Sequence, residues 1–283
     1  MTRFTRFAAV DWSGAKGARH KGIAIAVAEA GQGAPRLLRR AKPWSRSEVL
    51  AWVERSAGGT QPTLIGFDFS FAPPIHERGA YLPGEALAVE AKPFWAYVDR
   101  VCDDEDLGAA SFLEATHRPH FYFGAADGPK AAFLHHRRCE HAFNATGGGK
   151  ASTLYDAIGA AQVAKASFAG MRLLHRVEGR VAIWPFDPLP GSGGAIVEIY
   201  TRVFIRMAGL NGRKVRTRHG LNAALAALGS RPARLRDEPS DHETDVMIAA
   251  AGMRAIADNA RTWHPAGLTP ALAVTEGWTF GVR

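Results

Sequence analysis

Two apolar runs that each end in an aspartate constrain this chain more than any other feature of its sequence. Residues 6–12 contain the run FAAV directly before Asp11, and residues 62–67 (PTLIGF) directly precede Asp68. Both runs are typical of buried strands. A carboxylate at the end of such a strand is costly to bury unless it is paired, hydrogen-bonded or bound to a metal. Both aspartates therefore need partners from elsewhere in the chain.

The sequence between these two aspartates predicts a specific order of elements. Residues 21–30 alternate and residues 34–44 follow closely, so two further strands joined by short hairpins are expected. Ser45 then leads into a helix. Strand–strand–strand–helix–strand begins an α/β layer whose fourth strand runs parallel to the first. Asp11 and Asp68 are then expected at one carboxyl edge, where open α/β sheets usually carry their sites.

The rest of the chain predicts one α/β domain over residues 1–283, with a looser insertion at about residues 75–150. Residues 152–177 predict a long helix, and two more strands and several helices follow. A run of about 18 apolar residues is lacking, so no membrane-spanning helix is expected, and the N-terminus does not resemble a signal peptide. Two cysteines without a CxxC pair favour a reducing, cytoplasmic setting.

A late helix supplies further carboxylates. Ser240 and Glu243 fit the capping-box pattern S-x-x-E, which predicts that a helix starts at Ser240. Asp241 and Asp245 lie four residues apart and share one face with His242. Apolar positions of the same helix flank that face and are expected to direct it toward the sheet.

Acids at so many element ends predict a divalent-metal site. Glu198, in the strand sequence IVEIY, adds another position. Carboxylates about 4 Å apart in a partly dry site repel one another, so their pKa values rise or a cation neutralises them. Oxygen-rich sites of this kind suit Mg²⁺ or Mn²⁺. The alternatives are that Asp241 serves the helix dipole, that Asp68 caps a turn, and that Glu198 is an ion-paired core acid.

The formal net charge of +8 favours an anionic partner, nucleic acid first among them. The glycine loop NATGGGK lacks the residues of a P-loop but could hold a phosphate. The candidate substrate-binding residues are Lys150 in that loop, Arg138 beside Arg137 in an aromatic-rich segment, and Arg213, Lys214 and Arg216 in the densest basic run. Histidines within residues 117–120 and 135–141 lack a complete zinc-binding spacing, so zinc is not expected from them.

In its order of elements and acids, the chain resembles the ribonuclease H-like fold. The segment DHETDVMIAAAG resembles the final helix of Holliday-junction resolvases, in which two metal-binding positions lie three residues apart, as His242 and Asp245 do. The resolvases carry a glutamate where Asp68 stands, and they have no counterpart of Glu198. The whole-chain pattern is similar to the domain-of-unknown-function family 429, whose members are predicted ribonuclease H-like nucleases. The segments that carry this similarity are AAVDWSG, IGFDFSFAPP, VEIYTRVF, HETDVMIAAAG and EGWTFG.

The residues and the resemblance together predict a metal-dependent nuclease or phosphodiesterase that uses a two-metal carboxylate mechanism. The expected catalytic residues are Asp11, Asp68, Asp245 and His242. The expected ligands of Mg²⁺ or Mn²⁺ are Asp11, Asp68, Asp245, Asp241 and Glu198. One alternative is an ATP phosphotransferase of the actin-like or sugar-kinase type, since VDWSGAKG also fits a phosphate loop. The other is a protein of the same fold that binds nucleic acid without catalysis.

Overall fold

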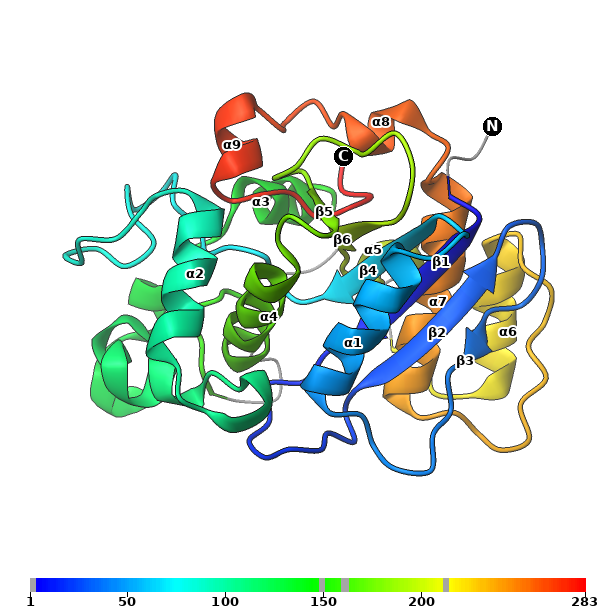
Figure 1. The fold of residues 1–283 in the computed structure, drawn as a ribbon, viewed down its shortest axis with the longest axis horizontal. Helices are drawn as coiled ribbons and strands as arrows, with labels where there is room; N and C mark the ends of the chain where they lie inside the picture. Colours follow the sequence, from blue (N-terminus) through cyan, green and yellow to red (C-terminus); the bar gives the residue numbers. More distant parts are fainter. Residues whose placement is uncertain (1–3, 148–150, 159–162, 211–213) are drawn as a thin grey trace.

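The strands form one mixed sheet (Figure 1). The computed structural model describes residues 4–147, 151–158, 163–210 and 214–283. Six strands lie in the order β3-β2-β1-β4-β6-β5; β1, β2 and β3 are antiparallel, and β4, β6 and β5 run parallel to β1. This confirms an α/β fold with antiparallel strands followed by parallel ones. The strands are β1 (Arg6–Asp11), β2 (Ala24–Glu29), β3 (Arg36–Leu37), β4 (Thr63–Asp68), β5 (Ala182–Trp184) and β6 (Ala195–Glu198).

Helices cover both faces of the sheet (Figure 1). Successive residues of β1 alternate between two apolar clusters: Ala8 and Val10 belong to one, and Phe7 and Ala9 to the other. The first cluster includes residues of α1, α2 and α4, and the second includes residues of α3 and α5–α8. The helices are α1 (Arg46–Ala57), α2 (Ala91–Val101), α3 (Arg138–Ala145), α4 (Ala164–Val177), α5 (Thr201–Met207), α6 (Arg218–Ala227), α7 (Asp241–Ile256), α8 (Ala260–Trp263) and α9 (Pro270–Val274).

The register of the parallel strands brings the two sequence aspartates together. Asp11 of β1 pairs directly with Asp68 of β4. Neighbouring strands in a sheet lie about 4.8 Å apart, so the two aspartates lie side by side at the carboxyl edge of the sheet. The predicted juxtaposition of these two strand ends is therefore confirmed.

Capping residues fix where two helices begin. Ser45 caps α1, and Glu48 completes its capping box. Ser240 caps α7, and Glu243 completes the capping box of that helix, as the sequence predicts. Helix α7 packs against β1 and β2. Because the helix starts beside the end of β1 and the beginning of β2, its first turns reach the edge that carries Asp11.

Two elements are shorter than the sequence predicts. The third strand is confined to Arg36–Leu37, since residues 39–43 are exposed. The predicted helix over 152–177 starts only at Ala164 in the described part of the chain. The reason is that the backbone around Tyr155 pairs with Tyr122: the Tyr122 N–H donates to the Tyr155 carbonyl at 2.8 Å, and the Ala157 N–H donates to the Tyr122 carbonyl at 2.9 Å.

The segment between β4 and α4 contains α2, α3 and a series of short helical turns. These turns are η1 (Glu105–Leu107), η2 (Phe112–Thr116), η3 (Arg118–His120), η4 (Ala125–Asp127) and η5 (Lys130–Phe133). None of the helices within the described ranges is both long and apolar enough to cross a bilayer.

Candidate functional site

Three aspartates from three elements face one cavity at the carboxyl edge of the sheet. Asp11 ends β1, Asp68 ends β4, and Asp245 lies in the second turn of α7. All three line a cavity of about 340 Å³. They are separated by up to 234 positions along the chain, so the parallel pairing of β1 with β4 and the packing of α7 bring them together.

Asp68 lies in the least favourable environment for a negative charge. Burial raises the pKa of its carboxyl well above the ordinary value, and the charges of Asp11 and Asp245 raise it further. The Thr201 hydroxyl at the start of α5 donates a hydrogen bond to Asp68 Oδ2 at 3.2 Å, which offsets part of this effect. The carboxylate form therefore needs additional positive charge.

Asp245 shows the same behaviour with a partial counter-charge. Burial raises its pKa to about 6, and the charge of Asp11 adds to the shift. Lys214 opposes the shift, with its Nζ 3.9 Å from Asp245 Oδ2 and 3.7 Å from Asp241 Oδ2. The lysine side chain is 55% exposed, so solvent weakens its effect on the acids.

His242 is the polar neighbour of Asp11. Its Nδ1 lies 2.7 Å from Asp11 Oδ2. This hydrogen bond raises the pKa of the imidazole, together with the charge of Asp11, whereas partial burial lowers it. The ring is 47% exposed, so His242 offers an imidazole with increased proton affinity at the open side of the cavity.

The aspartates share the cavity without forming a tight ligand cage. Within the described residues, two other groups bring three possible ligand atoms within 4.8 Å of one another: His76, Glu77 and His141, and Glu85, His117 and His120. Asp11, Asp68 and Asp245 do not form a group as compact as these two.

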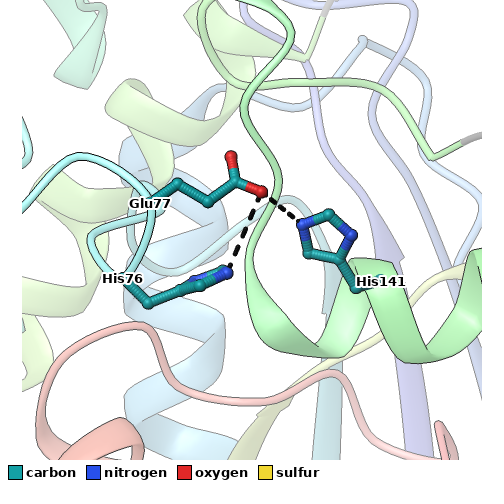
Figure 2. Close-up of side chains that lie close together, drawn as sticks. All are labelled: His76, Glu77 and His141. Carbon is teal, nitrogen blue, oxygen red and sulfur yellow. Dashed lines mark hydrogen bonds and ion pairs between the residues drawn. The ribbon is translucent and has the colours of Figure 1, made fainter.

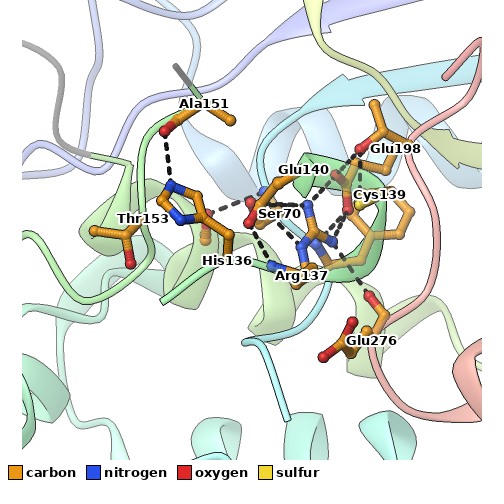
Figure 3. Close-up of polar contacts among 12 residues, drawn as sticks. Ser70, His136, Arg137, Cys139, Glu140, Ala151, Thr153, Glu198 and Glu276 are labelled. Atoms are coloured by element: carbon orange, nitrogen blue, oxygen red, sulfur yellow. Dashed lines mark hydrogen bonds and ion pairs between the residues drawn. The ribbon is translucent and has the colours of Figure 1, made fainter. Parts of the chain in front are cut away.

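Glu198 occupies a different electrostatic environment, shown in Figure 3. Arg137 Nη2 donates to its Oε1 at 2.5 Å, and Arg137 Nη1 donates to its Oε2 at 2.7 Å. The Thr279 hydroxyl and the Phe71 N–H complete the coordination of the two oxygens, at 2.7 and 2.8 Å. Glu198 is thus the ion-paired core acid of the alternative interpretation. Because protein donors already engage both of its oxygens, Glu198 is not retained as a metal ligand.

Arg137 is a buried hub rather than part of a nucleic-acid surface. Its side chain is 1% exposed. Besides Glu198, it donates to the Glu140 carboxylate, to the Ser70 hydroxyl and to the backbone carbonyl of Glu276 (Figure 3). This role is hard to predict from sequence, since Arg137 stands beside the exposed Arg138 and its one nearby acid is Glu140, three positions later.

The remaining basic candidates differ in where they lie. Arg138 is exposed on α3 and is not among the residues that line the cavity. Arg216 pairs with Asp241, its Nε 3.1 Å from Oδ1, so both side chains are engaged at the surface. Lys214 lines the cavity and faces its acids. Lys150 and Arg213 lie outside the described residues.

The loop after β1 bears on the ATP-binding alternative. A Cβ added to Gly14 would lie 2.3 Å from the backbone nitrogen of Ala166 in α4. Gly14 therefore allows the loop to pack closely against this helix. Close packing alone accounts for the glycine, without a phosphate.

Comparisons with protein-family models, with curated proteins and with solved structures gave no match.

Proposed function

We propose that this protein is a metal-dependent phosphodiesterase with a ribonuclease H-like core, and that it cleaves nucleic acid. The observation that carries the proposal is the convergence of Asp11, Asp68 and Asp245 on one cavity. Among the described residues, no arginine pairs with any of the three, although burial and mutual repulsion raise the pKa values of Asp68 and Asp245. Arg137, by contrast, neutralises Glu198 within the same cavity wall.

The donor set fits a hard divalent cation. Asp11, Asp68 and Asp245 supply oxygen ligands, as Mg²⁺ and Mn²⁺ prefer, and their excess negative charge favours binding of a cation. Asp241 lies farther out and is paired with Arg216, so it is an outer member of the set. When bound, such ions supply an activated water and stabilise the leaving oxygen.

His242 would hold a proton at the open side of the cavity. Its contact with Asp11 orients the ring and raises its pKa. A protonated imidazole there can donate to a phosphate oxygen or to a leaving group. Its exposure leaves it accessible to a large substrate.

The charge around the cavity favours an anionic substrate. Lys214 and Arg202 both contribute to the cavity lining, and the chain as a whole carries a net charge of +8. Phosphate contacts of this kind position a nucleic acid without selecting its sequence.

The proposal is tested by cleavage of single- and double-stranded DNA and RNA with Mn²⁺ present. We expect wild-type protein to cleave at least one of them, and Asp11→Asn to reduce the rate by at least about 100-fold because it removes a ligand. Asp258→Asn is the matched control, since Asp258 is exposed beyond the end of α7. Absence of cleavage by the wild type would overturn the proposal. ATP turnover that Asp11→Asn abolishes would support the phosphotransferase alternative.

A further inference from the structure

A second cluster of possible ligands lies away from the aspartates, where the chain after β4 meets α3. Figure 2 shows Glu77 between His76 and His141. Glu77 Oε1 lies 3.9 Å from His76 Nε2 and 2.5 Å from His141 Nε2. The three ligand atoms all lie within 4.8 Å of one another.

A buried carboxylate orients His76 for this role. Glu276 Oε1 lies 2.7 Å from His76 Nδ1, and the Glu276 side chain is fully buried. Because a carboxylate only accepts, Nδ1 carries the proton and the lone pair of the neutral ring lies on Nε2. That nitrogen is the one that faces Glu77. A histidine ligand whose second nitrogen donates to a carboxylate is the usual arrangement in metal sites.

Glu276 also fixes the two segments that carry the ligands. Its carboxylate accepts the N–H groups of Ile75 and His76 at 2.7 and 2.9 Å, and the N–H of Arg138 at 2.9 Å. Arg138 begins α3, the helix that carries His141. One buried acid therefore holds the backbone on both sides of the cluster in place before any ion binds.

The two oxygens of Glu77 are divided between two roles. Oε1 faces His76 and His141, while Oε2 accepts the backbone N–H of His136 at 3.3 Å and lies 3.3 Å from His135 Nδ1. The side chains of His76, Glu77 and His141 are 15%, 28% and 47% exposed. The cluster is thus anchored on its protein side and open on its solvent side.

We infer that His76, Glu77 and His141 form a Zn²⁺ site with one coordination position left open to solvent. Two imidazole nitrogens and one carboxylate oxygen are a donor set that zinc uses where it keeps a water or substrate position. The aspartate cavity offers mainly oxygen and suits Mg²⁺ or Mn²⁺, so the two sites differ in the metal they prefer. The zinc site does not depend on the proposed nuclease function.

Among the described residues, a second group of this kind consists of Glu85, His117 and His120, and it differs in its burial and hydrogen-bond partners. His117 is 3% exposed, its Nε2 lies 2.9 Å from the Tyr97 hydroxyl, and its Nδ1 lies 3.4 Å from the exposed Glu85, so no buried carboxylate orients this ring. His120 Nε2 also faces Glu85, at 3.3 Å. This group provides a matched control, since His120 can be replaced without touching the proposed zinc ligands.

The test uses the full chain freed of metal by a chelator, titrated with Zn²⁺ by calorimetry and with Co²⁺ by visible absorption. We expect Zn²⁺ to bind, and the Co²⁺ complex to show the absorption bands of a low-coordinate site with nitrogen ligands. Glu77→Gln and His141→Gln each lower the Zn²⁺ affinity by about 100-fold or more, and Glu276→Gln lowers it by about 10–100-fold through His76. Circular dichroism checks that each variant folds; Glu77 and His141 are exposed enough to be replaced without disturbing the core.

One variant should leave Zn²⁺ binding unchanged: His120→Gln, in the group formed by Glu85, His117 and His120. The inference is overturned if the wild type binds no zinc, if Glu77→Gln and His141→Gln bind it as tightly as the wild type, or if His120→Gln removes it. Failure of the nuclease assay would leave the zinc result standing, because the readout is binding.

Discussion

The wall of one cavity contains two groups of acids with opposite electrostatics. Glu198 and Glu140 face Arg137, which donates to both of them in a fully buried network. Asp11, Asp68 and Asp245 line the same cavity, and His242, Thr201 and the exposed Lys214 lie beside them. Acids of the first kind link secondary-structure elements through their ion pairs. Acids of the second kind repel one another, and a bound cation would reduce this repulsion. Asp11, Asp68 and Glu198 all lie at the end of a strand, so this position does not distinguish the two kinds of acid. The presence of an arginine partner does.

The largest expected effect comes from breaking the neutralised group. Arg137→Met leaves Glu198 and Glu140 buried without their cation, which should lower the free energy of unfolding by about 3–5 kcal/mol. Urea denaturation measures this loss. Arg138→Met replaces the exposed neighbouring arginine and should change the free energy by no more than about 0.5 kcal/mol. Equal effects of the two variants would contradict the role assigned to Arg137.

In the aspartate group, we expect a substitution to raise the free energy of unfolding instead of lowering it. Burial raises the pKa of Asp245 from its ordinary value of 3.8 to about 6 in the folded state, so the folded state binds this proton more tightly than the unfolded chain does. Stability from this group is therefore lost as pH rises from about 4 to 6. Asp245→Asn should be more stable than the wild type by about 1–3 kcal/mol above pH 6 and nearly equal to it below pH 4.

Urea unfolding at pH 4 and at pH 7.5, without divalent cations, checks this difference. A variant less stable than the wild type at pH 7.5 would show that Asp245 has a stabilising partner, as Glu198 has.

The difference between the two groups also separates what sequence could predict from what it could not. Asp11 and Asp68 follow apolar strands, so strand order was enough to place them together, and the pattern S-x-x-E located the start of α7 before Asp245. The partner of Glu198 lies 61 positions away, at the end of an irregular segment with no periodic pattern. Arg137 therefore appeared equivalent to Arg138 beside it.

The cluster of His76, Glu77 and His141, which we propose as a zinc site, was not predicted from sequence for the same reason. His141 lies among the histidines of residues 135–141, but its partners His76 and Glu77 lie 65 and 64 positions earlier, shortly after β4. Spacing rules detect ligands that share a helix or a hairpin. They miss sites whose ligands come from distant segments, such as His76 and His141, which tertiary contacts of Glu276 hold in place.

A smaller effect is expected from the one hydroxyl that assists Asp68. Thr201→Val removes its hydrogen bond to Asp68 Oδ2 and should lower the free energy of unfolding by about 1 kcal/mol at neutral pH. Added Mn²⁺ should restore part of this loss if the ion takes over the stabilisation of Asp68. Urea denaturation with and without Mn²⁺ measures both effects, and a variant that Mn²⁺ does not stabilise would count against a cation at Asp68.

The smallest effect is expected at Lys214. Lys214→Ala removes an exposed positive charge 3.9 Å from Asp245, so the affinity for Mn²⁺ should rise by about 2–5-fold at low ionic strength. The increase should shrink in high salt, where surface charges are screened. Calorimetry at two salt concentrations checks this, and an unchanged or lower affinity would indicate that the lysine does not oppose the cation.

The central claim is that Asp11, Asp68 and Asp245 converge to bind a divalent cation, and calorimetric titration with Mn²⁺ tests it most directly. The account predicts that the wild type binds Mn²⁺, that Asp11→Asn and Asp245→Asn abolish this binding, and that Asp258→Asn and Glu77→Gln leave it intact. Absence of binding to the wild type, or binding that survives in both Asp11→Asn and Asp245→Asn, would contradict it.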